Sequence, residues 1–569
     1  MQHGFERPWR GTRGPLLSGP LLLLLAVAFA LPARPGAGDP AQALSEAGQA
    51  ALHSLIDGGS HPDLEWRDFR DLREEVRRFY EGGGLAWSDA SGPTAQARAV
   101  AEILRGAAGK GLEPGDYDGP RWQERMATLS GRTPPPTDLE RVRFDVALTV
   151  SLLRYLSGLR FGRVEPRLVR FELGREQGGR ELSDLLRLRI VKAEDVASEV
   201  TSVEPPFAGY WRTLRALEVY SGLARLDDGE LLPVPRRPIG PGEPYSGLPR
   251  LRRLLRLVGD LAPGADVHTG ETVYDVALAE AVARFQRRHG LAPDGLLGAA
   301  TVEELNRPLS RRVAQLSLTL ERWRWLPRRF ASPPIVVNIP DFRLLAGDVG
   351  RRWSMKVVVG RAYRHQTPVF ASEMKYVVFR PYWNVPPGIQ RAEIVPRLAR
   401  DPGFLARGGY EVVDRRWQAP VAGDGSLDRL RTGELRLRQQ PGPRNALGLV
   451  KFVFPNAHDV YLHDTPSQEL FLQPRRDFSH GCIRVEDPVR LAAWVLRERP
   501  EWIPERIRAA MDGRETVQVN LPHPVPVLIL YGTAVVEEDG EVRFLDDIYG
   551  HDAALERALA ARRPYADAD

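Results

Sequence analysis

The sequence predicts a multi-domain α+β protein with a helical N-terminal half and a mostly β C-terminal part. Apolar residues recur at helical spacing between residues 68 and 159. A segment rich in proline and glycine, 233–247, then sets off a short module with three further helical patterns. From residue 334 onward the apolar runs become short and β-branched, with turns between them. A chain of 569 residues is long enough for several such domains.

The composition is that of a soluble protein with substantial cores. Hydrophobic residues make up 43% of the chain and charged residues 27%. The net charge of +5 is a mild basic bias, which suits an anionic cell wall but is explained equally well by a solvated surface. We therefore expect no nucleic-acid partner.

The N-terminus predicts export from the cytoplasm. Three arginines precede an apolar run, Leu16–Leu31. Its core, Leu21–Leu31, has the length of a signal-peptide apolar region and is too short for a membrane span. The tripeptide Ala28-Phe29-Ala30 offers a cleavage site between small residues. We expect a signal peptide over 1–30, a linker over 31–43 and a periplasmic mature protein. The alternative is an uncleaved anchor, which would be the only contact with a membrane.

Helical patterns organise the first half of the chain. They begin at Asp68, continue over Ala95–Gly106 and return over Val142–Leu159, where apolar residues occupy most sides of the helix and predict burial. Residues 44–246 carry no recognisable chemistry. We interpret them as a helical scaffold domain.

The module at 247–308 resembles the three-helix peptidoglycan-binding domain. The resemblance rests on Phe285-Gln286, on the turn Asp294–Gly298 and on Thr301. Asp-Gly and Gly-x-x-Thr also build turns and helix N-caps. The motif therefore indicates the family without telling which residues contact glycan.

The second half is predicted to be mostly β. Short strands are expected at Pro334–Ile339, Arg343–Ala346, Trp353–Val359, Lys375–Phe379, Leu449–Phe454, Val460–His463, Val517–Val519 and Val525–Tyr531. Helices are expected at Ser317–Leu326 and Asp487–Arg497. A long charged insert, 389–440, interrupts the strands and is partly helical in pattern. Loops of this length are commonly functional.

The only cysteine of the chain, Cys482, lies in the run Ser479–Val485 with His480 and Gly481. A thiolate is a strong nucleophile, and a nearby imidazole such as His463 lowers the pKa of the thiol or takes its proton. Gly481 leaves room beside the sulfur, and backbone N–H groups there would hold an oxyanion. This pattern indicates acyl transfer through a thioester.

Two other interpretations of Cys482 remain open at this point. A free cysteine is often an inert core residue. Mixed histidine and cysteine ligation also occurs in zinc sites, and His463, His480 and Cys482, with His458 nearby, offer such ligands. Their spacing matches no common zinc pattern.

His463 followed by Ser479-His480-Gly481-Cys482 resembles the signature of L,D-transpeptidases of the YkuD type. Arg484 stands where many members have asparagine, as in the large multi-domain Gram-negative branch typified by YcbB. The segments 381–387 and 547–550 resemble that branch too. The resemblance implies a catalytic domain over 309–569, with Cys482 as nucleophile, His463 as base and the insert as a capping subdomain. It also implies acylation by carbapenems.

The remaining site residues have two interpretations each. Arg484 would bind a stem carboxylate, or else form a salt bridge with Glu486 or Asp487. Tyr382 and Trp383 would line the cleft or belong to a core. We expect a backbone carbonyl, in preference to the Asp464 side chain, to orient the base.

The predicted function is peptidoglycan cross-linking without cofactor or metal. The expected partners are peptidoglycan stem peptides and glycan, with cell-wall synthesis enzymes as further partners. A carboxypeptidase or hydrolase would use the same cysteine and histidine with water as acceptor. A non-catalytic wall-binding protein is the third interpretation. The acyl acceptor is not encoded in any recognisable motif.

Overall fold

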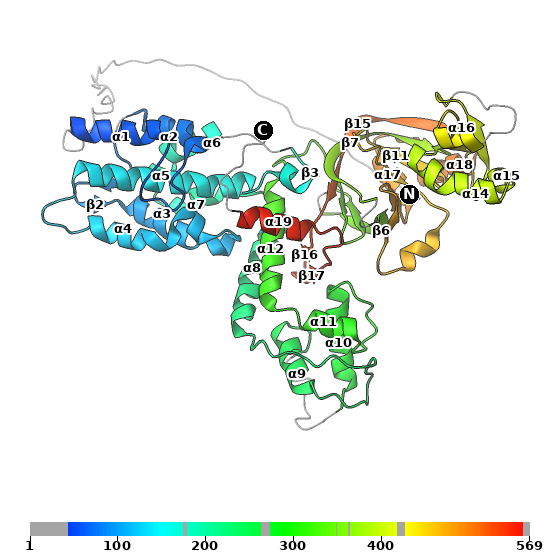
Figure 1. The fold of residues 1–569 in the computed structure, drawn as a ribbon, viewed down its shortest axis with the longest axis horizontal. Coiled ribbons are helices and arrows are strands. Elements are labelled where there is room, and N and C mark those ends of the chain that lie inside the picture. The colour runs from blue at the N-terminus through cyan, green and yellow to red at the C-terminus, as the bar shows by residue number, and fades with distance from the viewer. Residues whose placement is uncertain are drawn as a thin grey trace, which may run out of the picture. The chain divides into compact units, whose positions relative to one another are not determined.

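The computed structural model describes residues 44–561, except 83, 175–178, 263–272, 349, 362–364 and 418–426 (Figure 1). The predicted signal peptide and the linker that follows it lie outside the described residues. No helix in the described ranges is long and apolar enough to cross a membrane.

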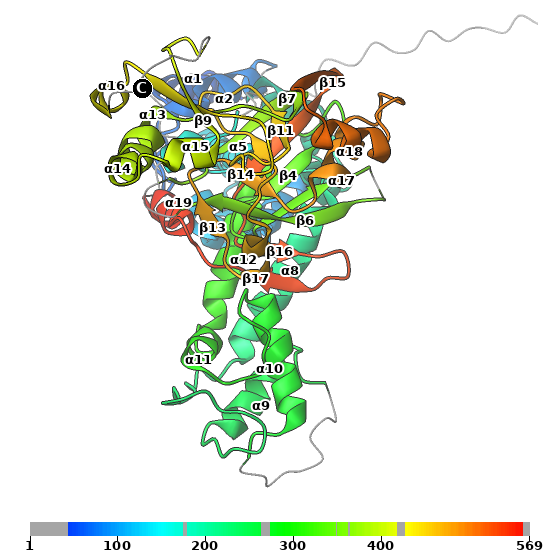
Figure 2. The same ribbon diagram turned by 90° about the vertical axis from the view of Figure 1, so that its right-hand side faces the viewer.

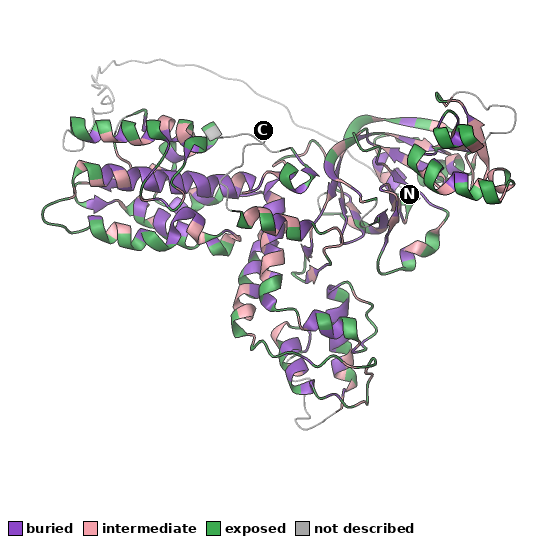
Figure 3. Cartoon of the chain, viewed as in Figure 1, coloured by how far each residue is buried: buried purple, intermediate pink, exposed green. Residues whose placement is uncertain are grey.

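The N-terminal helices pack around one buried helix, α5 (Asp138–Phe161). Figure 3 shows α5 buried along nearly all its length. A capping box between Thr137 and Glu140 fixes its start. The other helices of this bundle are α1 (Glu46–Gly58), α2 (Arg73–Tyr80), α3 (Ala95–Arg105), α4 (Trp122–Leu129), α6 (Gly179–Leu188) and α7 (Val196–Thr201). The predicted helical character of this part is confirmed.

Two helices that are far apart in sequence lie side by side after the bundle. They are α8 (Ala208–Leu226), which the sequence analysis missed, and α12 (Leu309–Arg324), which begins before the predicted Ser317. A hairpin of β16 (Ala534–Val536) and β17 (Val542–Phe544) shares their apolar core.

The short module is a three-helix unit, as predicted, made of α9 (Leu248–Leu257), α10 (Val276–Arg288) and α11 (Ala299–Leu305) (Figure 2). Its motif residues hold one turn. The buried side chain of Gln286 donates to Asp294 Oδ1 at 2.9 Å and to Thr301 Oγ1 at 3.1 Å, and its Oε1 accepts from the Gly295 N–H at 2.8 Å. These contacts serve the fold of the module.

The second half forms a closed sheet. In the described part, β11, β12, β14, β6, β5, β4, β15 and β7 are neighbours in that order, and β11 also pairs with β7, which closes the ring. The strands are β4 (Ile335–Asn338), β5 (Arg343–Ala346), β6 (Trp353–Gly360), β7 (Val369–Phe379), β11 (Val450–Val453), β12 (Leu462–His463), β14 (Ile483–Val485) and β15 (Val517–Leu530). At the edge, β3 (Phe171–Glu172) pairs with β7 and β13 (Asp477–Ser479) with β6.

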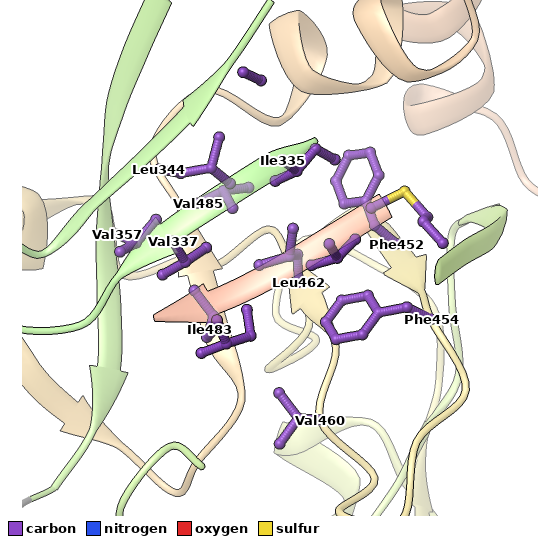
Figure 4. Close-up of a cluster of buried hydrophobic side chains, with 14 of the residues drawn as sticks. Ile335, Val337, Leu344, Val357, Phe452, Phe454, Val460, Leu462, Ile483 and Val485 are labelled. Carbon is purple, nitrogen blue, oxygen red and sulfur yellow. The ribbon is translucent and has the colours of Figure 1, made fainter. Parts of the chain in front are cut away.

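The interior of this sheet is apolar. Figure 4 shows Phe452, Leu462 and Ile483 pointing into one cluster together with valines of the neighbouring strands. All three residues are buried, and they are cross-strand partners. Because side chains alternate along a strand, the residues on either side of them face away from this core.

One predicted break does not exist. The two runs expected at Val517–Val519 and Val525–Tyr531 form the single strand β15, whose register shifts between Asn520 and Val525. The prolines between them mark an irregularity that the strand absorbs locally. Helices α17 (Pro488–Val495), α18 (Pro504–Asp512) and α19 (His551–Ala560) complete this part.

The insert is a small folded unit with its own core. It contains a π-helix (Gln390–Ile394) and a sheet in the order β8-β10-β9, with apolar residues such as Val385 and Leu437 packed between them. The unit begins at β8, before the predicted boundary. Its elements are β8 (Trp383–Asn384), α13 (Pro387–Ile389), α14 (Val395–Arg400), α15 (Phe404–Gly408), β9 (Tyr410–Val413), α16 (Leu427–Thr432) and β10 (Arg436–Gln439). Two turn-forming glycines of the insert, Gly423 and Gly425, lie outside the described residues.

Candidate active site

Strand register brings the motif residues together. In the β11, β12 and β14 strands, Lys451 is the cross-strand partner of His463, and His463 is the partner of Arg484. Directly opposed residues point to the same face of a sheet, and here it is the face away from the apolar core. Cys482 precedes β14 and aligns with Tyr461, because the Ile483 N–H donates to the Tyr461 carbonyl at 3.1 Å. Cysteine and histidine therefore share one surface.

His463 is oriented by the backbone, as expected. Its Nδ1–H donates to the Asp464 carbonyl oxygen at 2.6 Å. The Asp464 carboxylate has another task, because it accepts the Leu449 N–H at 2.8 Å. With Nδ1 protonated, Nε2 carries the free electron pair. Burial, aided by the charge of Arg484, lowers the pKa of His463 to about 3, so the ring is neutral at neutral pH and able to accept a proton.

Cys482 is a half-buried thiol. Its Sγ lies 3.7 Å from the Asp459 carbonyl oxygen. Burial raises the pKa of the Cys482 thiol, while hydrogen bonds from Tyr461 and the charge of Lys451 oppose that rise. The resting pair is therefore a neutral thiol and a neutral imidazole. Of the two roles expected for the imidazole, taking the proton during attack fits this arrangement.

The turn that carries the nucleophile depends on Gly481 and Ser479. Gly481 has φ 111°, a conformation that side-chain-bearing residues rarely adopt, and a Cβ there would lie 3.8 Å from the Gln366 carbonyl oxygen, an ordinary contact. Ser479 is buried, and its Oγ accepts the Gly481 N–H at 3.2 Å and donates to the Cys482 carbonyl at 2.5 Å. Ser479 thus shapes the turn. The Gly481 N–H is occupied, while the Cys482 N–H makes no hydrogen bond with any residue the structure describes.

A C-terminal segment braces this turn from the other side. Thr367 Oγ1 donates to the Gly481 carbonyl at 2.8 Å and accepts the Gly360 N–H at 2.9 Å. The Tyr549 hydroxyl donates to the Gly360 carbonyl and accepts the Thr367 N–H at 3.3 Å. The segment 547–550 noted in the sequence therefore supports the site without touching the sulfur.

His480 is held by the insert. Its Nε2 is hydrogen-bonded to a carboxylate oxygen of Glu393, which belongs to the π-helix of that unit. The ring of His365 lies 4.7 Å from the His480 ring, measured between centroids. His480 is thus committed to the contact between motif and insert, a role that sequence spacing alone did not indicate.

Arg484 is half-buried and retains unused donor capacity. Its buried Nε has no hydrogen-bond partner among the described residues. The two acids considered as salt-bridge partners are engaged elsewhere: Glu486 lies 3.5 Å from Lys356, and Asp487 caps α17. Burial lowers the pKa of Arg484 below its ordinary value, although a guanidinium remains charged.

The two aromatic residues of the 381–387 segment, Tyr382 and Trp383, have different contacts. The Trp383 side chain is hydrogen-bonded to the Tyr461 side chain, which in turn is hydrogen-bonded to Cys482. Tyr382 is 41% exposed and lies under the Arg438 guanidinium, 4.3 Å from its ring centroid. Trp383 therefore belongs to the site and Tyr382 does not contact it.

Two of the histidines that were considered as metal ligands, His458 and His480, are paired with carboxylates. His458 Nε2 lies 3.0 Å from Glu172, and His480 is bonded to Glu393. Within the described ranges, no group of three histidine, cysteine or acidic side chains is placed to hold a metal ion.

Sequence reasoning missed three site residues: Lys451, Asp459 and Tyr461. The signal for Lys451 was present, since a lysine interrupts the apolar run Val450–Val453 on a strand whose neighbours are buried. Asp459 has φ 53°, which is uncommon for a residue with a side chain. Its backbone conformation was not readable from sequence.

Cys482 and a backbone-oriented imidazole therefore share one face of a closed sheet that also carries a folded insert. Residues 333–527 match the L,D-transpeptidase catalytic domain family, YkuD. Residues 74–217 match the family described as "Scaffold domain", and residues 247–305 match the "Putative peptidoglycan binding domain". Residues 333–527 are thus similar to a YkuD-type L,D-transpeptidase catalytic domain, and the three-helix module is similar to a peptidoglycan-binding domain.

One curated relative supports the same family. The chain is 32% identical over 248 residues to a Haemophilus influenzae protein named "Putative L,D-transpeptidase". The match covers 43% of this chain and 49% of that protein, so the chain spans about half the length of this relative. The narrower branch typified by YcbB stays a prediction.

Proposed function

We propose that this protein is an L,D-transpeptidase that cross-links peptidoglycan through a thioester on Cys482. The observation that carries the proposal is the shared face of Cys482 and His463 on adjacent strands inside the region that matches the family. A neutral His463 with its Nδ1–H bound to a carbonyl has the correct free nitrogen for a general base.

In the first half-reaction, the Cys482 sulfur attacks the carbonyl carbon of the third residue of a tetrapeptide stem. His463 takes the thiol proton as the S–C bond forms, and the charge moves to the carbonyl oxygen. The Cys482 N–H, which is not otherwise used in the described part of the chain, would donate to that oxygen. The imidazolium then protonates the amine of the terminal D-alanine, which leaves.

In the second half-reaction, the amine of an acceptor stem attacks the thioester. Neutral His463 removes the amine proton, and sulfur leaves as the new peptide bond forms. Arg484 is the residue we assign to the stem carboxylate, because its half-buried guanidinium has an unpaired Nε and makes no ion pair with the described residues. The charge of Glu469 acts on it only from beyond ion-pair distance. Trp383 and the Tyr461 ring would line the donor stem.

Hydrolysis is the alternative reaction at the same site. Water in place of the amine would make the protein an L,D-carboxypeptidase, with Cys482 and His463 unchanged in role. The folded insert next to His480 favours transfer over hydrolysis, because a cap limits the access of water to the thioester. A purely wall-binding role is disfavoured by the intact cysteine and histidine pair.

The discriminating experiment uses purified full-length protein and a defined disaccharide-tetrapeptide. We expect mass spectrometry to detect cross-linked dimer and released D-alanine. Tripeptide without dimer, in the presence of excess acceptor, would establish the hydrolase instead. If neither product forms while the protein still binds peptidoglycan sacculi, the wall-binding role is supported instead.

We also propose a periplasmic location, since the substrate is outside the cytoplasmic membrane and the N-terminal sequence has signal-peptide character. Fusion of the first 43 residues to a reporter that is active only after export tests this. Activity equal to that of a leaderless reporter would contradict it. The glycan is the expected ligand of the three-helix module, whose motif residues themselves are used to hold its turn.

A further inference from the structure

Lys451 occupies an unusual place beside the sulfur. It lies in β11 between Val378 of β7 and His463 of β12, on the face that carries the site. Its Nζ lies 3.6 Å from the centroid of the Tyr461 ring, which is a close cation–π contact. The ammonium group is thus fixed over an aromatic ring in direct contact with the nucleophile.

Lys451 forms no ion pair with any residue that the structure describes. The groups whose negative charges act on it from a greater distance are Cys482, when ionised, and Asp459. Burial lowers the pKa of Lys451 below its ordinary value. A half-buried ammonium that makes no close ion pair is costly, so the negative charge that forms on Cys482 is a favourable neighbour for it.

The residue type is itself informative. Only five of the 79 lysines and arginines of this chain are lysines. Where a charge pairs with carboxylates on the surface, this protein uses arginine almost throughout. Lysine supplies a compact point charge, whereas arginine supplies a planar, delocalised one.

Tyr461 connects the ammonium to the sulfur. Both its backbone N–H and its hydroxyl are hydrogen-bonded to Cys482, and its ring carries Lys451 on one face. The Trp383 side chain is hydrogen-bonded to the same hydroxyl and fixes its direction. A positive charge over the ring makes the hydroxyl a stronger donor toward a negative sulfur.

We propose that Lys451 is the positioning residue that stabilises negative charge on Cys482, acting by its field and through Tyr461. This rests on the proposed role of Cys482 as nucleophile. When the thiol proton moves to Nε2 of His463, the electron pair of the S–H bond stays on sulfur, beside the ammonium. The same charge stabilises sulfur as the leaving group when the acceptor amine attacks.

The charged residues around the sulfur differ in sign, so the proposal can be tested by neutralising a positive and a negative residue separately. Arg484 and a protonated His463 are positive, whereas the Asp459 carboxylate opposes the thiolate. Neutralising Lys451 and neutralising Asp459 should therefore change thiol reactivity in opposite directions. Asparagine tolerates the positive φ of residue 459, so Asp459→Asn leaves the turn intact.

The experiment is the pH dependence of alkylation by iodoacetamide, followed by intact-protein mass spectrometry from pH 6 to 10. Cys482 is the only cysteine, so every adduct reports this thiol. We expect Lys451→Met to react about tenfold more slowly at pH 8 and to approach the wild-type rate at high pH, because an opposite charge nearby typically shifts a pKa by about one unit or more. Asp459→Asn should react faster than wild type at pH 8. Lys192→Met, at an exposed position of the scaffold, is the matched control and should follow the wild-type curve.

A Lys451→Met profile that coincides with the wild-type profile would overturn the inference, as would acceleration. Lys451→Gln repeats the test with a polar side chain, and thermal unfolding verifies that both variants are folded. Alkylation needs no stem peptide. A protein that failed to cross-link but showed the two opposite shifts would refute the proposed function and retain the role of Lys451.

Discussion

His480 Nε2 is hydrogen-bonded to the carboxylate of Glu393, and this contact joins the nucleophile turn to the inserted unit. Residues 87 positions apart in the chain meet here. Glu393 lies in a π-helix, a form of helix that is rare and often found at functional sites. The state of the insert is therefore coupled to the residue two positions before Cys482.

The first prediction concerns this contact. Glu393→Gln should weaken the attachment of the insert, because a neutral amide replaces a charge-assisted acceptor. We expect the ratio of cross-linked dimer to hydrolysed tripeptide to fall severalfold, measured from one tetrapeptide substrate. Glu434→Gln is the control, since Glu434 lies in the same insert and forms a surface ion pair with Arg429. An equal fall in both variants would mean that general loosening, and not the His480 contact, is responsible.

The second prediction concerns removal of the insert. Val385 belongs to the core of this unit, whereas Trp383 of β8 belongs to the site, so the excision spans 385–440, replaced by a short Gly/Ser loop, and retains Trp383. The closed sheet should remain folded, since each doubling of loop length costs only about 0.6 kcal/mol. Transpeptidation should fall and thioester hydrolysis rise as water reaches the acyl-enzyme. An unchanged product ratio in a folded variant would show that the insert is no lid.

The third prediction identifies the nucleophile. Wild-type protein should gain one carbapenem adduct by mass, and Cys482→Ala should gain none while unfolding at nearly the same temperature. The side chain is half-buried, so loss of the sulfur removes little packing. An adduct on the alanine variant would place the nucleophile elsewhere.

The fourth prediction is a pH profile. Since the pKa of His463 is lowered to about 3, the imidazole is deprotonated and competent as a base throughout the range above pH 4. The reacting pair is a neutral thiol and a neutral imidazole, so the rate of carbapenem acylation of wild-type protein should stay flat from about pH 5 to 8. It should rise only above that range, where the Cys482 thiol, whose pKa burial raises, begins to ionise. A rate that climbs steadily from about pH 5 to 8 would indicate that free thiolate, and not the base-assisted thiol, is the attacking species. His463→Ala should slow acylation by about 10²–10⁴-fold, the usual contribution of a general base, and more than His480→Ala does.

The fifth prediction addresses the three-helix module. Gln286→Ala should destabilise it by about 2–4 kcal/mol, because it leaves the buried partners of that amide in the Asp294–Gly298 turn unsatisfied. Hydrogen exchange of the α10 amides, together with thermal unfolding of the protein, measures this loss of stability in the module. Arg287→Ala, at the exposed next position of the same helix, should change stability little. Equal effects of the two substitutions would contradict the role of Gln286 as the staple of the turn.

Local patterns in the sequence correctly indicated most elements and the class of the site. The β-branched runs around Val450 and Leu462, and the periodicity of the helix at Val142–Leu159, reflect nearest-neighbour burial that every strand or helix must satisfy. The expectation that a backbone carbonyl orients His463 was also confirmed, because that contact spans one residue. The spacing of His463 and Cys482 resembled a family signature that residues 333–527 match.

Contacts between residues far apart in the sequence determine the charges and hydrogen bonds around Cys482. The sequence alone determined the nucleophile motif, a mostly β domain and a three-helix module, since these depend on residue type and local period. Only the tertiary structure placed Lys451 over Tyr461, joined Glu393 to His480 and showed that Ser479 serves the turn. Strand pairing between distant segments sets which side chains meet, and the field at the sulfur is a sum over those neighbours. No local pattern encodes that sum.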